Sequence, residues 1–287
     1  MLRSMSPTKS LLLSLFVLSS TLVACGPRPV ARPPSPVRLD LPAFTGGRAA
    51  CLVVTDTGGN LVAREGGARC ARRYSPCSTF KIPNTVIGLE TGVLMGPDTV
   101  IPWDRERYPP ENWWPPEWTD RVHDLRSAFA HSFVPYYRAL ATRIGREAMV
   151  RHLKIFAYGD QTIGERLDGF WLDGALRISA DEQVRFLRAL HLGRLGVSAR
   201  SLAVLQEIMV HETRDGHVLR AKTGTCGGKE SSASLGWIVG SVEHGDRVHF
   251  FAFNVDGATT AEIGRLWRFD VLRALLAKLK LWPRVEK

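Results

Sequence analysis

The sequence lacks three features by which common classes of protein are identified. No apolar run approaches the roughly 20 residues that a membrane-spanning helix requires. The five cysteines do not show the short paired spacings of a zinc cluster. Basic residues do not alternate with aromatic residues in repeats, and no nucleic-acid-binding motif is present. We therefore interpret the formal net charge of +10 as solvated surface that favours anionic substrates or envelope polymers, and expect no nucleic acid as a partner.

The first 24 residues have the composition of an export signal. Arg3 and Lys9 form a basic start, and residues 11–18 form an apolar core that is too short to span a membrane. The segment Leu22-Val23-Ala24-Cys25 resembles a bacterial lipobox, which predicts cleavage before Cys25 and lipidation of its thiol. We therefore expect residues 1–24 to be a signal peptide and the protein to be an exported, periplasmic lipoprotein. An ordinary signal peptide cleaved nearby is the alternative.

Residues 25–45 are rich in proline and arginine, which predicts an extended tether. One acyl chain binds a membrane only marginally, so Arg28 and Arg32 beside the lipid would add attraction to anionic headgroups. Loss of residues 1–24 removes two basic residues and no acidic one, which lowers the formal charge from +10 to +8. The remainder, residues 46–287, is long enough for one large domain or two closely packed subdomains.

Apart from the cysteine expected to carry lipid, four cysteines remain, as suits an oxidising compartment. Cys51 and Cys70 flank a predicted strand hairpin within residues 51–65 and are candidates for a disulfide. Cys77 and Cys226 are candidates for a second one because both adjoin the motifs described below. Spacing does not determine connectivity, since four cysteines allow three pairings, and Cys77 and Cys226 as buried thiols remain an equal alternative.

The hydrophobic period changes along the chain from strands to helices and back. Strands are predicted at 51–56, 61–65, 217–225, 234–242 and 248–255, and helices at 81–89, 125–130, 136–144, 147–156, 180–192, 198–210 and 260–281. This order predicts an α/β (α+β) fold in which both chain ends contribute to one antiparallel sheet flanked by helices. The helical middle would form its own lobe, with a cleft between lobe and sheet.

Residues 97–119 interrupt this order with six prolines and four tryptophans. We interpret them as a surface loop that a few aromatic rings anchor. The alternative is a rim that binds apolar groups of a substrate.

Ser78 and Lys81 stand three residues apart at the start of a predicted helix, so their side chains lie on one face. A serine hydroxyl is a weak nucleophile until a neighbouring base takes its proton. Burial lowers the pKa of a lysine amine and lets it act as that base, and Phe80 and Ile82 provide apolar surroundings. Taken alone, the run Ser78-Thr79-Phe80-Lys81 also suits an ordinary helix start with a solvated lysine.

Further motifs stand in order along the chain and decide between these interpretations. They are Ser132-Phe133-Val134, Tyr158-Gly159-Asp160, Phe170-Trp171-Leu172 and Lys222-Thr223-Gly224. With Ser78-Thr79-Phe80-Lys81 they resemble the class D (oxacillinase-type) serine β-lactamases of the penicillin-recognising serine enzyme superfamily, over roughly residues 48–280. Departures from the family pattern are Asp160 in place of asparagine, Cys226 after the Lys-Thr-Gly motif, and a longer tryptophan–proline loop.

The resemblance implies a β-lactamase/DD-peptidase-like fold and hydrolysis of a β-lactam through an acyl-enzyme on Ser78. It implies that Lys81 reacts with CO2 to become an N6-carboxylysine, the general base of both half-reactions, with no other cofactor and no metal. Trp171 would donate its indole N–H to that group. Val134 and Leu172 would keep the surroundings apolar.

The same resemblance assigns the remaining roles. Ser132 would relay a proton to the leaving nitrogen, and Lys222 would supply positive charge beside it. The oxyanion hole would be the backbone N–H groups of Ser78 and Thr225. Thr223 and Gly224 would contact the substrate, and Arg265 would grip its carboxylate. Because the alignment slips by one residue there, Arg268 is the alternative.

Two other functions remain open at this stage. A penicillin-binding sensor would be acylated at Ser78 and turn over slowly, and a cell-wall peptidase would use Lys81 as a free amine. The sequence leaves the range of β-lactams open and is compatible with a monomer or a homodimer.

Overall fold

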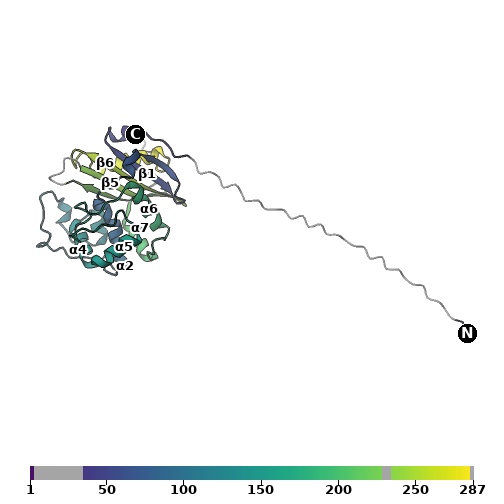
Figure 1. Ribbon diagram of the computed structural model, residues 1–287, viewed down its shortest axis with the longest axis horizontal. Coiled ribbons are helices and arrows are strands. Elements are labelled where there is room, and N and C mark those ends of the chain that lie inside the picture. The colour runs from purple at the N-terminus through teal and green to yellow at the C-terminus, as the bar shows by residue number, and fades with distance from the viewer. Residues whose placement is uncertain (3–34, 228–233, 285–287) are drawn as a thin grey trace. The chain divides into compact units, whose positions relative to one another are not determined.

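The computed structural model describes residues 1–2, 35–227 and 234–284 (Figure 1). The predicted signal peptide, Cys25 and the first part of the predicted tether lie outside these residues, apart from Met1 and Leu2. The chain divides into the unit Met1–Pro33 and the unit Pro34–Lys287, and the description below concerns the second. Within the described residues, no helix is both long and apolar enough to cross a membrane.

A six-stranded antiparallel sheet forms the centre of the second unit, in the order β2-β1-β6-β5-β4-β3. Its strands are β1 (Ala50–Asp56), β2 (Leu61–Glu65), β3 (Val210–Arg214), β4 (His217–Cys226), β5 (Ser234–His244) and β6 (Arg247–Gly257). Because β1 pairs with β6, the two ends of the chain share the sheet, which confirms the predicted architecture (Figure 1).

Eight α-helices are described in this unit: α1 (Leu41–Thr45), α2 (Lys81–Glu90), α3 (Leu125–Ala130), α4 (Val134–Ile144), α5 (Arg146–Ile155), α6 (Ala180–His191), α7 (Ala199–Ile208) and α8 (Arg265–Lys278). Three short 3-10 turns accompany them: η1 (Gly67–Cys70), η2 (Cys77–Phe80) and η3 (Pro116–Trp118). Ser179 caps α6 as predicted, in a reciprocal capping box with Glu182. The predicted helix over 260–281 is shorter at both ends.

Alternation along the strands gives the sheet two apolar faces. On β1, Val53 joins a core with Phe80, Trp171 and other residues of the helical lobe, whereas its neighbour Leu52 joins a second core with Leu272 of α8. Figure 1 shows α2, α4, α5, α6 and α7 gathered on one side of the sheet. The sheet therefore separates a helical lobe from the C-terminal helix.

Two predictions about boundaries need correction. Leu39 and Leu41 are buried in the second core, so the folded unit begins before residue 45, where the predicted tether ends. Residues 210–214 form the edge strand β3, whereas the sequence predicts a helix up to residue 210. This strand is only half-buried and therefore carries a weak hydrophobic pattern.

Candidate active site

The serine and lysine of the first motif meet at the junction of η2 and α2. Lys81 Nζ lies 2.9 Å from Ser78 Oγ, in hydrogen-bonding contact. The Lys81 side chain is fully buried, and this burial lowers its pKa to about 7. At neutral pH a large fraction of Lys81 is therefore a neutral amine, which can accept the proton of a neighbouring hydroxyl.

The second serine and lysine come from elements 90 residues apart in sequence. Ser132 lies in the tight turn between α3 and α4 at a φ of 59°, and Lys222 lies on β4. Lys222 Nζ donates to Ser132 Oγ over 3.1 Å and to the carbonyl oxygen of Thr223. Burial, followed by the nearby charges of Lys81 and two arginines, holds the pKa of Lys222 well below its usual value. An anionic group bound beside it would reverse this effect and favour the ammonium form.

Strand β4 passes directly against the backbone of η2. A Cβ atom on Gly224 would lie 2.9 Å from the carbonyl oxygen of Pro76 and 3.2 Å from the amide nitrogen of Ser78, so only glycine permits this approach. Thr225 follows at once, and its hydroxyl accepts a hydrogen bond of 3.0 Å from Arg268 Nη2. The strand thus brings the segments that carry the Ser78 and Thr225 amides together.

Aromatic rings surround the buried side chain of Lys81. The ring of Tyr137 lies 5.2 Å from Lys81 Nζ, and Phe80 stacks on Trp171 with centroids 5.2 Å apart. Trp171 is fully buried, and its Nε1 has no hydrogen-bond partner among the described residues. A buried indole N–H without an acceptor is costly, so this atom is suited to a further acceptor group.

A cleft with a volume of about 600 Å³ opens beside Ser78. It is lined by most of the sequence-predicted residues: Ser78, Ser132, Val134, Leu172, Thr223, Thr225, Arg265 and Arg268. Lys81, Lys222 and Trp171 are buried rather than part of this lining. Leu172 is partly exposed at the wall of the cleft, so Tyr137 and Phe80 do more to shield the lysine region.

Further side chains that were not named individually as site residues also line the cleft, among them Glu111, Trp113, Glu117, His131 and Arg138. Glu111, Trp113 and Glu117 belong to the loop for which the sequence leaves a rim open, and His131 directly precedes Ser132. The tryptophan–proline loop is anchored as predicted, because Trp103 and Trp118 each pack edge-on against Phe133 at 5.7 Å. The loop also contributes Trp113 and Trp118 to the cleft lining, and binding of apolar substrate groups by this loop stays a prediction.

Asp160 does not belong to the cleft lining. Its Oδ1 accepts hydrogen bonds from the backbone amides of Thr162, at 3.2 Å, and Arg177, at 3.1 Å. Gly159 precedes it at a φ of 58°, and a Cβ there would lie 2.1 Å from the carbonyl oxygen of Arg177. The carbonyl oxygen of an asparagine can accept the same two bonds, so this departure from the family pattern concerns the turn rather than the substrate wall.

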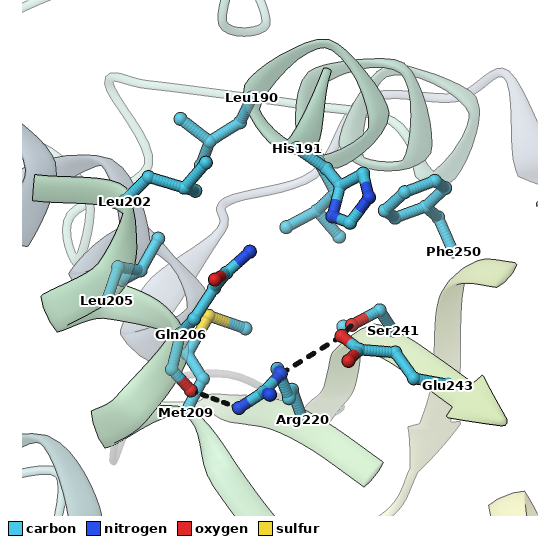
Figure 2. A pocket seen from close by; sticks show the side chains of 12 residues that line it. Leu190, His191, Leu202, Leu205, Gln206, Met209, Arg220, Ser241, Glu243 and Phe250 are labelled. Atoms are coloured by element: carbon cyan, nitrogen blue, oxygen red, sulfur yellow. Dashed lines mark hydrogen bonds and ion pairs between the residues drawn. The ribbon is translucent and has the colours of Figure 1, made fainter. Parts of the chain in front are cut away.

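A separate pocket lies between α6, α7 and strands β4–β6 (Figure 2). Its volume of about 40 Å³ is far below the 300–1,000 Å³ of typical small-molecule sites. Figure 2 shows Arg220 pointing toward Glu243, with which it forms an ion pair of 3.0 Å, while leucines line the opposite wall. None of the predicted site residues contributes to it.

Comparisons with known proteins agree with this geometry. Residues 50–267 match the penicillin binding protein transpeptidase domain family. β-Lactamase OXA-10 of Pseudomonas aeruginosa is 42% identical over 190 residues, which cover 66% of this chain and 69% of the relative.

Solved structures share the fold over most of the chain. The class D β-lactamase YbXI from Nostoc is 33% identical with a TM-score of 0.77, over 85% of this chain and 100% of that structure. The C-terminal domain of the Bacillus licheniformis BlaR penicillin-receptor is 26% identical with a TM-score of 0.76, over 85% of this chain and 96% of that domain. The cleft, its two serine–lysine pairs and these likenesses place the chain in the penicillin-binding transpeptidase-domain family, and within it among the class D β-lactamases.

Proposed function

We propose that this protein hydrolyses the β-lactam amide bond of penicillin-type antibiotics through an acyl-enzyme on Ser78, and so confers resistance to them. The observation that carries the proposal is the contact of 2.9 Å between Ser78 Oγ and a fully buried amine at the edge of the large cleft. Attack by Ser78 forms the ester bond and breaks the ring C–N bond, and water then cleaves the ester.

Lys81 is proposed to carry a carboxyl group in the active enzyme. A neutral amine combines with CO2 to form a carbamate and release a proton, and burial of Lys81 provides the neutral amine. The unpartnered Nε1 of Trp171 supports this fit, because it can donate to a carbamate oxygen. The carbamate would supply an anionic base for the proton of Ser78 and later for that of the hydrolytic water.

The other residues would act on the substrate directly. Ser132 would pass a proton to the ring nitrogen as it leaves, with Lys222 Nζ held 3.1 Å from its hydroxyl. The amides of Ser78 and Thr225 would donate to the developing oxyanion, and such donors are each worth about 3 kcal/mol at the transition state. Thr223 and Gly224 would align the substrate along β4.

Arg265 is proposed to grip the substrate carboxylate. Its side chain is exposed at the cleft, whereas Arg268 is buried and already donates to Thr225 and to the carbonyl oxygen of Ile263. We expect Arg265→Ala to raise KM for a penicillin about tenfold with kcat nearly unchanged, because a free guanidinium fork is lost. Steady-state kinetics of Arg265→Ala and Arg268→Ala check this prediction. If only Arg268→Ala raises KM, Arg268 is the residue that binds the carboxylate.

Turnover of a chromogenic cephalosporin tests the proposal as a whole. We expect many equivalents to be hydrolysed per enzyme, and none by Ser78→Ala, because the nucleophile is lost. The likeness to the penicillin-receptor domain favours one alternative, a sensor that is acylated but turns over slowly. One bound equivalent without turnover would support that sensor and contradict hydrolysis.

The other alternative is a cell-wall peptidase, which would cleave a D-Ala-D-Ala peptide. The presence of Trp171 argues against the peptidase.

The N-terminus is proposed to be a signal peptide followed by a lipidated Cys25, which would tether the exported enzyme to a periplasmic membrane face. Because the acyl chain would be the anchor, Cys25→Ala should move most of the protein from the membrane fraction to the soluble fraction. Immunoblots of fractionated cells measure this, with activity per folded molecule unchanged as the control. Retention of the variant in the membrane fraction would contradict lipid anchoring.

A further inference from the structure

A disulfide joins the two segments that meet at the reaction centre. Cys77 and Cys226 are 149 residues apart in sequence, and they are bonded with their Cα atoms 5.7 Å apart. Cys77 directly precedes Ser78, and Cys226 directly follows Thr225. The bond therefore adjoins both backbone amides proposed to form the oxyanion hole.

The backbone on the Cys77 side is strained and closely held. Cys77 has a φ of 46°, a left-handed conformation that residues other than glycine rarely adopt. Its amide donates to the carbonyl oxygen of Trp171 over 3.1 Å, which ties the same turn to the tryptophan beside the lysine. Such a conformation persists only where its surroundings impose it, and the disulfide is the covalent part of those surroundings.

The Cys226 side is the end of a strand. Thr225 and Cys226 pair with Gly236 and Leu235 of β5, and β4 ends at Cys226. On the other side of β4, Gly224 approaches η2 without a side chain between the two backbones. The disulfide links β4 to η2 at Cys226, which directly follows Thr225 and is the last residue of the strand.

We propose that the Cys77–Cys226 disulfide is a positioning element of the reaction: it fixes the Ser78 amide relative to the Thr225 amide. This inference rests on the proposed function. An oxyanion forms only as the reaction proceeds, so loss of the bond lowers kcat and the rate of acylation more than it changes KM. Both cysteines belong to the cleft lining; Cys77 is nearly fully buried and Cys226 is partly exposed, so a small dithiol would approach the bond at Cys226.

The protein contains a matched control. The disulfide Cys51–Cys70 is fully buried and joins β1 to η1, and neither cysteine lines the cleft. Removal of either disulfide takes a cross-link from the unfolded chain and lowers the melting temperature. Only removal of Cys77–Cys226 would also disturb the oxyanion hole.

The experiment compares C77A/C226A with C51A/C70A and wild type at 25 °C, well below each melting temperature. For C77A/C226A we expect kcat and the acylation rate with a fluorescent penicillin to fall about 10- to 100-fold, with KM within about threefold. For C51A/C70A we expect kcat within about twofold of wild type despite a lower melting temperature. Equal losses of kcat in both variants, or no loss in C77A/C226A, would overturn the proposal.

If C77A/C226A does not fold, reduction of the disulfide in the wild-type protein tests the same role. Dithiothreitol delivers two electrons and two protons to the bond and becomes a cyclic disulfide, leaving two thiols that alkylation and mass spectrometry locate. We expect kcat to fall as Cys77 and Cys226 become alkylated while circular dichroism stays unchanged, and full activity at complete reduction would overturn the role. If the oxidised enzyme proves not to hydrolyse β-lactams, the proposed function fails, and the acylation rate of Ser78 still decides the role of the disulfide.

Discussion

Lys81→Ala is expected to lower β-lactam hydrolysis by about 1,000-fold or more and to leave any acyl-enzyme that forms on Ser78 intact for hours. Lys81 Nζ is the basic group in contact with Ser78 Oγ, at 2.9 Å, and its carboxylated form is the proposed base for both half-reactions. Mass spectrometry of the protein after mixing with a penicillin measures the persistent adduct. Lys154→Ala, which removes an exposed lysine of α5, is the matched control and should keep wild-type turnover.

The same proposal makes the wild-type enzyme depend on CO2 and pH. With a pKa of about 7, the neutral fraction of Lys81 rises from roughly 10% at pH 6 to 90% at pH 8. Because only the neutral amine combines with CO2, depletion of CO2 should lower activity, and less bicarbonate should restore it at pH 8 than at pH 6. Full activity in CO2-depleted buffer at both pH values would contradict the carbamate.

The part of the site that depends on local geometry follows from the sequence. Ser78 and Lys81 are three residues apart, and helical periodicity alone places them side by side. The pairing of Ser132 with Lys222 joins positions 90 residues apart and was expected only from the family resemblance. No periodicity in either segment indicates that the turn before α4 faces β4.

Features that depend on tertiary packing were open or missed. The pairing of Cys77 with Cys226 depends on the approach of β4 to η2, about which cysteine spacing carries no information. Trp113 and Glu117 lie in an irregular loop, so no hydrophobic pattern predicts that they line the cleft. Arg268 is buried although arginine is usually exposed, because its guanidinium finds acceptors in Thr225 and Ile263.

The pKa of Lys222 bears on the resemblance in a different way. The resemblance assigns a positive charge to this position, yet burial and the charges of an unmodified Lys81, Arg265 and Arg268 lower the pKa of Lys222. A substrate carboxylate would offset those charges, so binding and protonation of Lys222 would favour one another. Carboxylation of Lys81, as proposed, would replace one of these cations by an anion and would favour the ammonium form of Lys222 as well.

Trp171→Phe is expected to lower kcat about 100-fold and to raise the bicarbonate concentration needed for half-maximal activity. Phenylalanine keeps an aromatic ring against Phe80 but removes the Nε1 donor, which has no other partner among the described residues. Loss of one oxyanion-hole donor lowers kcat by about 10²- to 10³-fold, and we expect a loss of similar size for this donor to the charged base. Bicarbonate titrations of kcat at pH 7 and pH 8 measure both effects.

Trp282→Phe is the matched control for this variant. Trp282 is also buried with an Nε1 that lacks a partner among the described residues, but it belongs to the core on the α8 side of the sheet. Trp282→Phe should leave kcat and the response to bicarbonate unchanged, and it should change the stability of the protein about as much as Trp171→Phe does. If Trp171→Phe lowers kcat by the same factor at saturating and at limiting bicarbonate, Trp171 does not hold a carboxyl group on Lys81. The indole would then act only by packing, and the unpartnered donor would have no part in catalysis.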